Sequence, residues 1–493
     1  MNKIDKFLLI YIGIFFIFLI FTIPLTTIHA DEGTHCLLAL FYKDMFTAVL
    51  GNLNLSFQRL YDFGISYLTH YPKLQVFYPP LYHLITGFIF YPILGVSIIS
   101  ARLANVIMTI LTVTVFYFVT RQFFNRKVSF IATILFSLFP VTLEIGRMAM
   151  MEFTAFFFIL VSLYFYQKAW KTHKYSHYIL TSITVFLAII SKRPAFLLVF
   201  VYSLHILYRK KWRKLIFFLI PLLLLVPYLL ILERINGFEI SSIIHSKYAF
   251  YVIDWEYPFK FPFLFVLFFL FFYHNYKKMG EKEKLFVLWF FIFFIGILFL
   301  SFKEKSYVYF LIPVFMVSGN YLYKIKKRWL CIFLVGYFIL SLFITVRDWR
   351  NYPQIEKISY EIYSNLPKEA NVAMFSESSN RYSSAFMFHL GSLDKDKNLF
   401  FYRPCKFYNK TREEILDLIE KNNVYHIIAI PGKVGYENVN KIEDKLRLVE
   451  DGPIELYEVK EFIPKQKEYC NYVCLTEEKI CTEYKNPFSV FES

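Results

Sequence analysis

The chain has 493 residues, of which 57% are hydrophobic and 21% aromatic, including 60 Phe. One soluble core of this length cannot bury so many large apolar side chains, so the composition excludes an ordinary soluble protein and indicates a polytopic membrane protein. The net charge of +16 comes from short basic clusters between apolar runs, which favours membrane orientation over nucleic-acid binding.

The first apolar run extends from Phe7 to Ile28. It is longer than the roughly 7–15 apolar residues of a secretory signal, so we predict a retained transmembrane helix. Asp31 and Glu32 follow almost directly, as two adjacent carboxylates at the membrane edge. Such a pair is either a solvated helix end or a working site.

The loop after this first span is polar and aromatic, and we predict two amphipathic helices in it, at 36–50 and 53–68. The sequence Tyr78-Pro79-Pro80-Leu81-Tyr82-His83 then opens an apolar stretch that ends at Leu94. About fourteen residues are too few for a crossing, which needs roughly 20, so we interpret 81–94 as an interfacial segment within an outer loop at 30–99.

Ten further apolar runs follow, at 100–120, 128–143, 152–169, 177–191, 195–208, 214–232, 259–276, 284–301, 306–323 and 328–346. Basic clusters lie between many of them, at 121–127, 168–174, 209–214, 277–284 and 324–328. If 81–94 does not cross, all these clusters share the side of the N-terminus, which the positive-inside rule makes the cytoplasm. We therefore predict eleven transmembrane helices at 1–346 in the cell membrane, with the N-terminus cytoplasmic.

An odd number of spans places residues 347–493 on the side opposite the N-terminus, outside the cytoplasm, where we predict a small α/β domain. Segments 371–375 and 425–430 have the composition of short buried strands. Thr411 followed by Glu414 is typical of a capping box at the start of a helix extending to Lys421. Four cysteines in this region favour disulfides over zinc, with three pairings left open: Cys405, Cys470, Cys474 and Cys481.

Several charged residues share the predicted outer face with Asp31 and Glu32. Glu152 heads an apolar run, where a carboxylate is costly unless it lines a polar cavity or meets a cation such as Arg147. Outward-facing cations could bind a lipid phosphate at headgroup level, or could simply snorkel toward headgroups; they are Arg102, Lys192, Arg193, Lys303 and Lys305. A divalent metal site near His245 is a further alternative, although no ligand spacing there is diagnostic.

These parts predict a reaction in which a carboxylate takes a proton from an acceptor while cations stabilise a departing lipid phosphate. The order of motifs over residues 1–330 resembles the GT-C integral-membrane glycosyltransferases, in the branch of protein O-mannosyltransferases and lipid A aminoarabinose transferases. The residues that carry this resemblance are Asp31-Glu32; Tyr78-Pro79-Pro80-Leu81-Tyr82; Gly95 and Arg102; Gly146-Arg147-x-Ala149-x-x-Glu152; Ser191-Lys192-x-Pro194; and Lys303-x-Lys305-x-Tyr307 before Pro313.

The resemblance implies a polyprenyl-phosphate sugar donor, inversion at the sugar carbon, and a protein, glycan or lipid acceptor at the outer face. It implies that Asp31 is the catalytic aspartate and that Lys192 lies near the donor phosphate. The chain departs from the family at Tyr78, which is lysine in the aminoarabinose branch, and at Glu152, which replaces an aspartate. Two other functions stay open: a transporter or flippase of a lipid-linked or anionic solute, which should carry charges deep within its spans, and a non-catalytic scaffold.

Overall fold

The computed structural model describes most of the chain: residues 3–25, 31–51, 56–71, 74, 78–228, 230, 262–275, 279–299, 307–347, 355–375, 381–393, 398–402, 410–430, 433–451, 454–460, 469–472 and 479–482. Its internal contacts divide the chain into two compact units. The first contains Met1–Thr26, Phe77–Tyr82 and Arg102–Trp349, and the second contains Thr27–Val76, His83–Ala101 and Arg350–Ser493. Segments far apart in sequence therefore build each unit.

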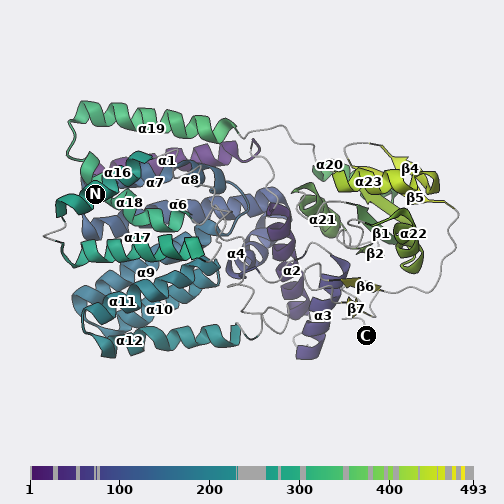
Figure 1. Ribbon diagram of the computed structural model, residues 1–493, viewed down its shortest axis with the longest axis horizontal. Coiled ribbons are helices and arrows are strands. Elements are labelled where there is room, and N and C mark those ends of the chain that lie inside the picture. The colour runs from purple at the N-terminus through teal and green to yellow at the C-terminus, as the bar shows by residue number, and fades with distance from the viewer. Residues whose placement is uncertain are drawn as a thin grey trace. The chain divides into compact units, whose positions relative to one another are not determined.

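The first unit is helical, and its helices run side by side in Figure 1. Its elements are α1 (Lys3–Thr22), α7 (Arg126–Ser137), α8 (Pro140–Ile145), α9 (Glu152–Thr172), α10 (Tyr175–Ile189), η2 (Arg193–Phe196), α11 (Leu197–Tyr208), α12 (Trp212–Leu219), η3 (Ile220–Leu224), α16 (Pro262–Asn275), α17 (Glu281–Phe299), α18 (Tyr307–Leu322) and α19 (Lys327–Arg347). Helices α4 (Leu81–Ile85) and α6 (Ile98–Phe123) contribute residues to both units.

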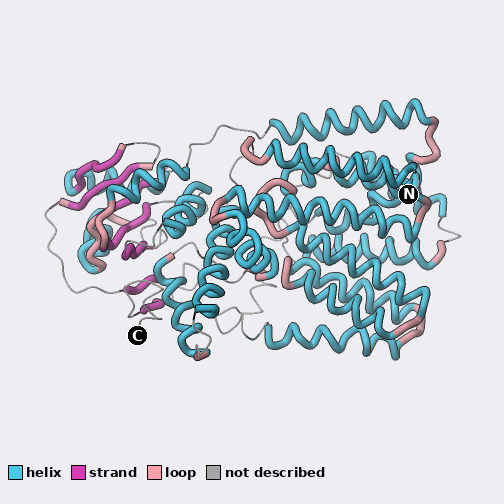
Figure 2. Tube along the Cα trace, turned by 180° about the vertical axis from the view of Figure 1, so that it is seen from behind, coloured by secondary structure: helices cyan, strands magenta, loops and turns pink. Residues whose placement is uncertain are grey.

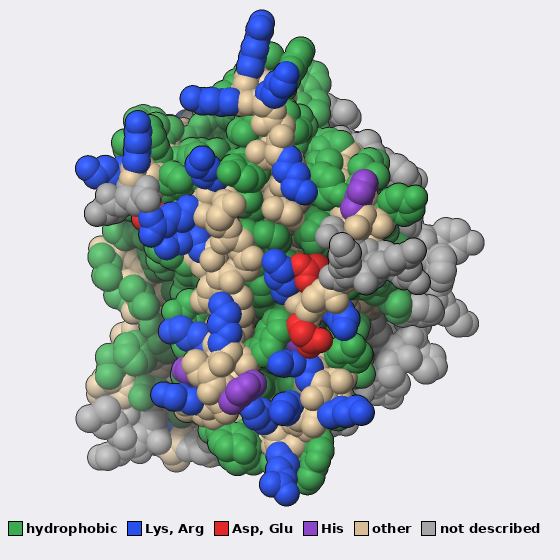
Figure 3. All heavy atoms as spheres, turned by 90° about the vertical axis from the view of Figure 1, so that its left-hand side faces the viewer, with side chains coloured by type: hydrophobic (Ala, Val, Ile, Leu, Met, Phe, Trp, Pro, Cys, Tyr) green, Lys and Arg blue, Asp and Glu red, His purple; other side chains and the backbone are tan. Residues whose placement is uncertain are grey.

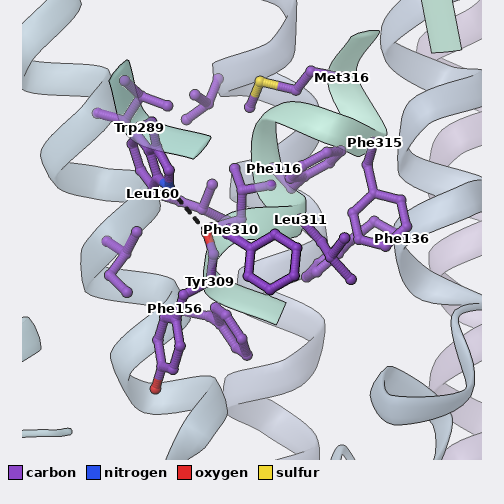
Figure 4. Packing of buried hydrophobic residues seen from close by; sticks show 14 of the residues in the cluster. Phe116, Phe136, Phe156, Leu160, Trp289, Tyr309, Phe310, Leu311, Phe315 and Met316 are labelled. Atoms are coloured by element: carbon purple, nitrogen blue, oxygen red, sulfur yellow. Dashed lines mark hydrogen bonds between the residues drawn. The ribbon is translucent and has the colours of Figure 1, made fainter. Parts of the chain in front are cut away.

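Large aromatic side chains fill the core of the first unit. Phe156 and Tyr309 pack with ring centroids 4.6 Å apart, and the Trp289 indole Nε1 donates a hydrogen bond of 2.9 Å to the backbone oxygen of Tyr309 (Figure 4). Phe136 and Phe315 meet edge to face. Aromatic residues thus bind α7, α9, α17 and α18 into one bundle.

Among the described residues, three helical segments are long and apolar enough to cross a membrane by themselves: Lys3–Thr22, Ile98–Phe123 and Lys327–Thr345. Five shorter apolar helices accompany them, among them Leu81–Leu94. The total of eleven spans stays a prediction.

One face of the helical unit gathers Lys and Arg side chains and shows few acids (Figure 3). Several Lys and Arg side chains of this unit lie beside aromatic rings, such as Lys168 over Tyr164 at 4.5 Å and Lys284 over Tyr208 at 4.9 Å. Long cationic side chains at the ends of apolar helices commonly mark a membrane–water boundary.

The second unit combines helices with a mixed sheet, whose strands are drawn in magenta in Figure 2 and which has five strands. Its elements are α2 (Glu32–Gly51), α3 (Phe57–His70), η1 (Thr86–Phe90), α5 (Tyr91–Leu94), α20 (Ile355–Asn365), β1 (Glu369–Phe375), α21 (Arg381–Leu393), β2 (Asn398–Tyr402), α22 (Arg412–Lys421), β3 (His426–Ala429), α23 (Lys433–Ile442), η7 (Glu443–Lys445), β4 (Leu446–Glu450), β5 (Glu455–Val459), β6 (Tyr469–Tyr472) and β7 (Lys479–Thr482).

The sheet has the order β2-β1-β3-β5-β4. Strand β1 pairs in parallel with β2 and β3, while β5 pairs antiparallel with β3 and β4. The parallel pairs need crossover connections, and α21 and α22 supply them. Strands β6 and β7 form a separate antiparallel pair.

Local sequence signals in this unit are confirmed. The two helices expected in the first loop are α2 and α3. Strands β1 and β3 are buried along nearly their whole length. Thr411 and Glu414 form the predicted capping box at the start of α22.

Candidate functional site

Asp31 and Glu32 lie at the start of α2, in the second unit. The Asp31 carbonyl accepts a hydrogen bond of 2.9 Å from the His35 backbone amide, so Asp31 belongs to the first helical turn. Carboxylates are favoured there by the helix dipole. Glu32 is fully buried, whereas Asp31 is half-buried. Asp31 therefore remains accessible to a ligand.

A polar stripe on α6, in the first unit, holds the segment that carries Arg147. The Asn105 amide donates to the backbone oxygens of Ile145 and Met148, at 2.7 and 2.8 Å. Thr109 donates to the Gly146 oxygen at 3.1 Å. These side chains are buried inside an otherwise apolar helix.

Thr112 extends this stripe by donating to the Phe153 oxygen at 3.0 Å, in the first turn of α9. Gly146 is required by close packing, because a Cβ at that position would lie 2.4 Å from the Thr142 oxygen. The sequence prediction did not include Asn105, although a buried amide in a membrane-spanning run is a recognisable signal of a functional or structural polar contact.

Arg147 is a buried cation, with 1% of its surface exposed. Burial lowers the pKa of its guanidinium to about 10; Glu144 opposes this effect, and the charge of Arg102 adds to it. Arg102 is also buried and donates to the Ile23 backbone oxygen at 2.9 Å. Two guanidinium groups that repel each other in a buried setting favour the binding of an anion between or beside them.

Glu152 and Lys192 form an ion pair of 2.6 Å between α9 and the segment after α10. The Glu152 side chain is 1% exposed and that of Lys192 is 22% exposed. The expected carboxylate–cation contact is thus made with Lys192. Pairing of this kind offsets the cost of burying the carboxylate at the head of α9.

Arg193 begins η2, directly after Lys192. Burial lowers the pKa of its guanidinium, and Tyr228 and Tyr78 act on it electrostatically. The Leu81 backbone amide donates to the Ile190 oxygen at 3.0 Å, which joins the Tyr-Pro-Pro-Leu-Tyr segment to the end of α10. Tyr82, in the same segment, is buried.

Tyr309 is a further candidate that the sequence prediction missed, since the motif pointed to Tyr307. Its side chain is fully buried, and its hydroxyl has no hydrogen-bond partner among the described residues. It interacts electrostatically with Glu152. A buried, unpaired hydroxyl beside an ion pair is suited to receive a polar ligand.

The predicted site residues therefore fall into two groups. The first unit holds three sets of interacting residues, with Tyr82 in the same unit: Arg147 with Arg102 and Glu144; Glu152 with Lys192; and Arg193 with Tyr78 and Tyr228. The second unit holds Asp31 and Glu32. Each group is described within its own unit.

Three predicted ligands, His245, Lys303 and Lys305, lie outside the described residues, as do Cys405 and Cys474. Cys470 and Cys481 occupy opposing positions in the backbone register of β6 and β7. Within the described part of the chain, no group of three or more His, Cys, Asp or Glu is arranged to hold a metal ion.

Comparison with known proteins gives both a sequence match and structural matches. Residues 78–232 match the profile of the dolichyl-phosphate-mannose-protein mannosyltransferase family. A search of curated proteins finds no match.

Two solved structures are similar along most of the chain. ArnT from Cupriavidus metallidurans bound to undecaprenyl phosphate aligns with a TM-score of 0.67 at 13% identity, covering 94% of this chain and 99% of ArnT. The oligosaccharyltransferase AglB from Archaeoglobus fulgidus, in complex with an inhibitory peptide and a dolichol-phosphate, aligns with a TM-score of 0.54 at 12% identity, covering 87% of this chain and 70% of AglB. The chain thus has the GT-C fold of these two proteins, and its residues 78–232 match the dolichyl-phosphate-mannose-protein mannosyltransferase family.

Proposed function

We propose that this protein is an inverting glycosyltransferase that moves a monosaccharide from a polyprenyl-phosphate donor to a protein, glycan or lipid acceptor. The observation that carries the proposal is the buried pair of guanidinium groups on Arg102 and Arg147, which repel each other while Arg147 also interacts electrostatically with Glu144. The same unit holds the Glu152–Lys192 ion pair and Arg193. Cations of this kind can stabilise the charge that a departing lipid phosphate develops.

In the proposed reaction, Asp31 accepts the proton of the acceptor hydroxyl. The acceptor oxygen forms a bond to the anomeric carbon while the bond from that carbon to the phosphate oxygen breaks, which inverts the carbon. The lipid phosphate leaves with the bonding electron pair. Arg102, Arg147 and Arg193 stabilise its charge, and Glu152 orients Lys192 through their ion pair.

We propose that the reaction takes place at the outer face of the cell membrane, with residues 347–493 as an extracytoplasmic domain and 1–346 as the membrane domain. The Lys- and Arg-rich face of the helical unit (Figure 3) supports a cytoplasmic position for that face. The structures of ArnT with undecaprenyl phosphate and of AglB with dolichol-phosphate support a polyprenyl-phosphate donor.

The test uses the full chain purified into lipid nanodiscs and a panel of labelled polyprenyl-phosphate hexoses and pentoses, with total membrane glycans and glycolipids as acceptors. We expect wild-type transfer from at least one donor, and its loss in Asp31→Asn. Asp62→Asn is the matched control, because Asp62 is a carboxylate on α3 that accepts an exposed hydrogen bond from Gln58. Near-normal transfer by Asp31→Asn would refute the role of Asp31 as base.

A further inference from the structure

One face of α2 packs along the helical segment at 81–94, immediately after Asp31 and Glu32. The Tyr91 hydroxyl donates to the Cys36 backbone oxygen at 3.2 Å. At Gly87 the two backbones approach so closely that a Cβ would lie 2.4 Å from the Ala39 oxygen. Residues 35, 39 and 43 are spaced by four, so they lie along one side of α2. This side faces the segment at 81–94.

At the end of this face nearest Asp31, the contact between the helices is a pair of histidines. The His35 Nδ1 and the His83 Nε2 lie 3.0 Å apart, with ring centroids 5.1 Å apart. Both side chains are almost fully buried, at 2% and 0% exposure. A hydrogen bond between two imidazole nitrogens needs a proton on one and a lone pair on the other. The pair therefore keeps this bond only while at least one ring is neutral.

The geometry around the pair links it to the carboxylates. His35 is one helical turn after Asp31 and donates its backbone amide to the Asp31 oxygen at 2.9 Å. Glu32, three residues before His35, lies on the same side of α2 and is fully buried. His83 stands just before the π-helical turn η1, and π-helical turns commonly re-aim side chains at functional sites.

Two apolar side chains could pack these helices together equally well, but they would not fix a ring direction. We propose that His35 and His83 are positioning residues, which hold the Asp31-bearing turn of α2 on the segment at 81–94 through one shared proton. This inference rests on the proposed function insofar as Asp31 is the base. The bond orients the His35 ring, which fixes the first turn of α2 and thereby the Asp31 side chain.

Other titratable groups also lie on the packed elements. They are Asp31, Glu32, Cys36, Tyr42, Lys43 and Asp44 at and along α2, Tyr82 on α4, Tyr91 on α5, Arg59, Tyr61, Asp62, Tyr67 and His70 on α3, and Arg381, Tyr382 and His389 on α21. The Tyr67 hydroxyl donates to Asp44, and the His70 ring bonds to the Ser66 backbone oxygen.

The first experiment compares His83→Gln with His83→Phe by the pH profile of sugar transfer. Gln keeps a side-chain amide that can donate or accept, so we expect kcat within about threefold of wild type at pH 7.5. Phe fills the space but removes the bond, so we expect kcat to fall at least tenfold with little change in KM. The wild type should also lose activity at the acid pH where both rings are protonated, because two imidazolium rings have no lone pair to accept the bond; His83→Gln should lack this part of the decline. Full activity of His83→Phe, or an unchanged acid decline in His83→Gln, would overturn the proposal.

A second measurement requires no substrate. We expect the slope of unfolding free energy against pH, between pH 5 and 6.5, to be shallower in His83→Gln than in wild type by up to one proton. If wild type and His83→Gln give equal slopes, the shared proton is overturned, whether or not any sugar is transferred. If the slopes differ but the wild type transfers sugar from no donor, the proposed function is refuted and the shared proton stands. Stoichiometric zinc in the dialysed wild type, absent from His83→Gln, would instead identify a metal site and overturn the proposal.

Discussion

Removal of Lys192 tests how the buried Glu152 carboxylate is stabilised. The two groups are 2.6 Å apart, and Glu152 is 1% exposed. Loss of one partner from a buried pair costs about 3–5 kcal/mol. Because the Lys192 side chain is 22% exposed, water offsets part of this cost, and we expect Lys192→Met to lower the unfolding free energy by about 3 kcal/mol.

The double variant Lys192→Met with Glu152→Gln should be less destabilised than Lys192→Met alone, because no buried charge remains uncompensated. We expect a coupling free energy of about 2 kcal/mol from a double-mutant cycle, measured by SDS unfolding of the purified protein with circular dichroism. The control cycle uses Lys357 and Glu361, which form an exposed pair on α20 at 3.6 Å and should give about 0.5 kcal/mol or less. A Glu152–Lys192 coupling no larger than that control would refute the argument.

Three further predictions follow from the packing and the buried groups. Asn105→Leu removes two hydrogen bonds and should lower the unfolding free energy by about 1–3 kcal/mol in the same SDS assay; Thr114→Val, which loses a bond only within its own helix, is the control. Gly146→Ala must displace the Thr142 oxygen, so thermal unfolding should shift to lower temperature and transfer should fall, in contrast to Gly64→Ala, which has open space. Burial lowers the pKa of His389 to about 4, so the unfolded chain binds more protons between about pH 6.5 and 4. The unfolding free energy should therefore decrease as the pH is lowered across that window, by about 2 kcal/mol at pH 5. His389→Phe should lessen this decrease.

The sequence predicted the elements whose signals are local. The Thr411–Glu414 box requires only three residues of spacing, and the buried strands β1 and β3 show continuous apolar runs. Most charged residues of the candidate site, although not Glu144, were proposed from the sequence for the same reason, since a carboxylate or guanidinium stands out in an apolar run.

Contacts between distant segments could not be predicted in this way. Lys192 and Glu152 are forty residues apart, and His35 and His83 forty-eight. Each histidine by itself is consistent with an ordinary buried side chain, and only the packing of α2 on the segment at 81–94 brings their ring nitrogens together. The composition of the second unit, which joins 27–76 to the region after 350, likewise depends on tertiary contacts.

Neutral residues of the first unit position the segment that carries the buried Arg147. Glu144 already acts electrostatically on Arg147, and a second carboxylate beside it would cancel more of the charge that a phosphate requires. Asn105 and Thr109 instead bind backbone oxygens of the segment that carries Arg147, at 2.7–3.1 Å. They fix the position of the cation without neutralising it. An electrostatic site preorganised in this way stabilises developing phosphate charge without reorganisation during the reaction, which is why we expect Asn105→Leu to reduce transfer more than its effect on folding accounts for.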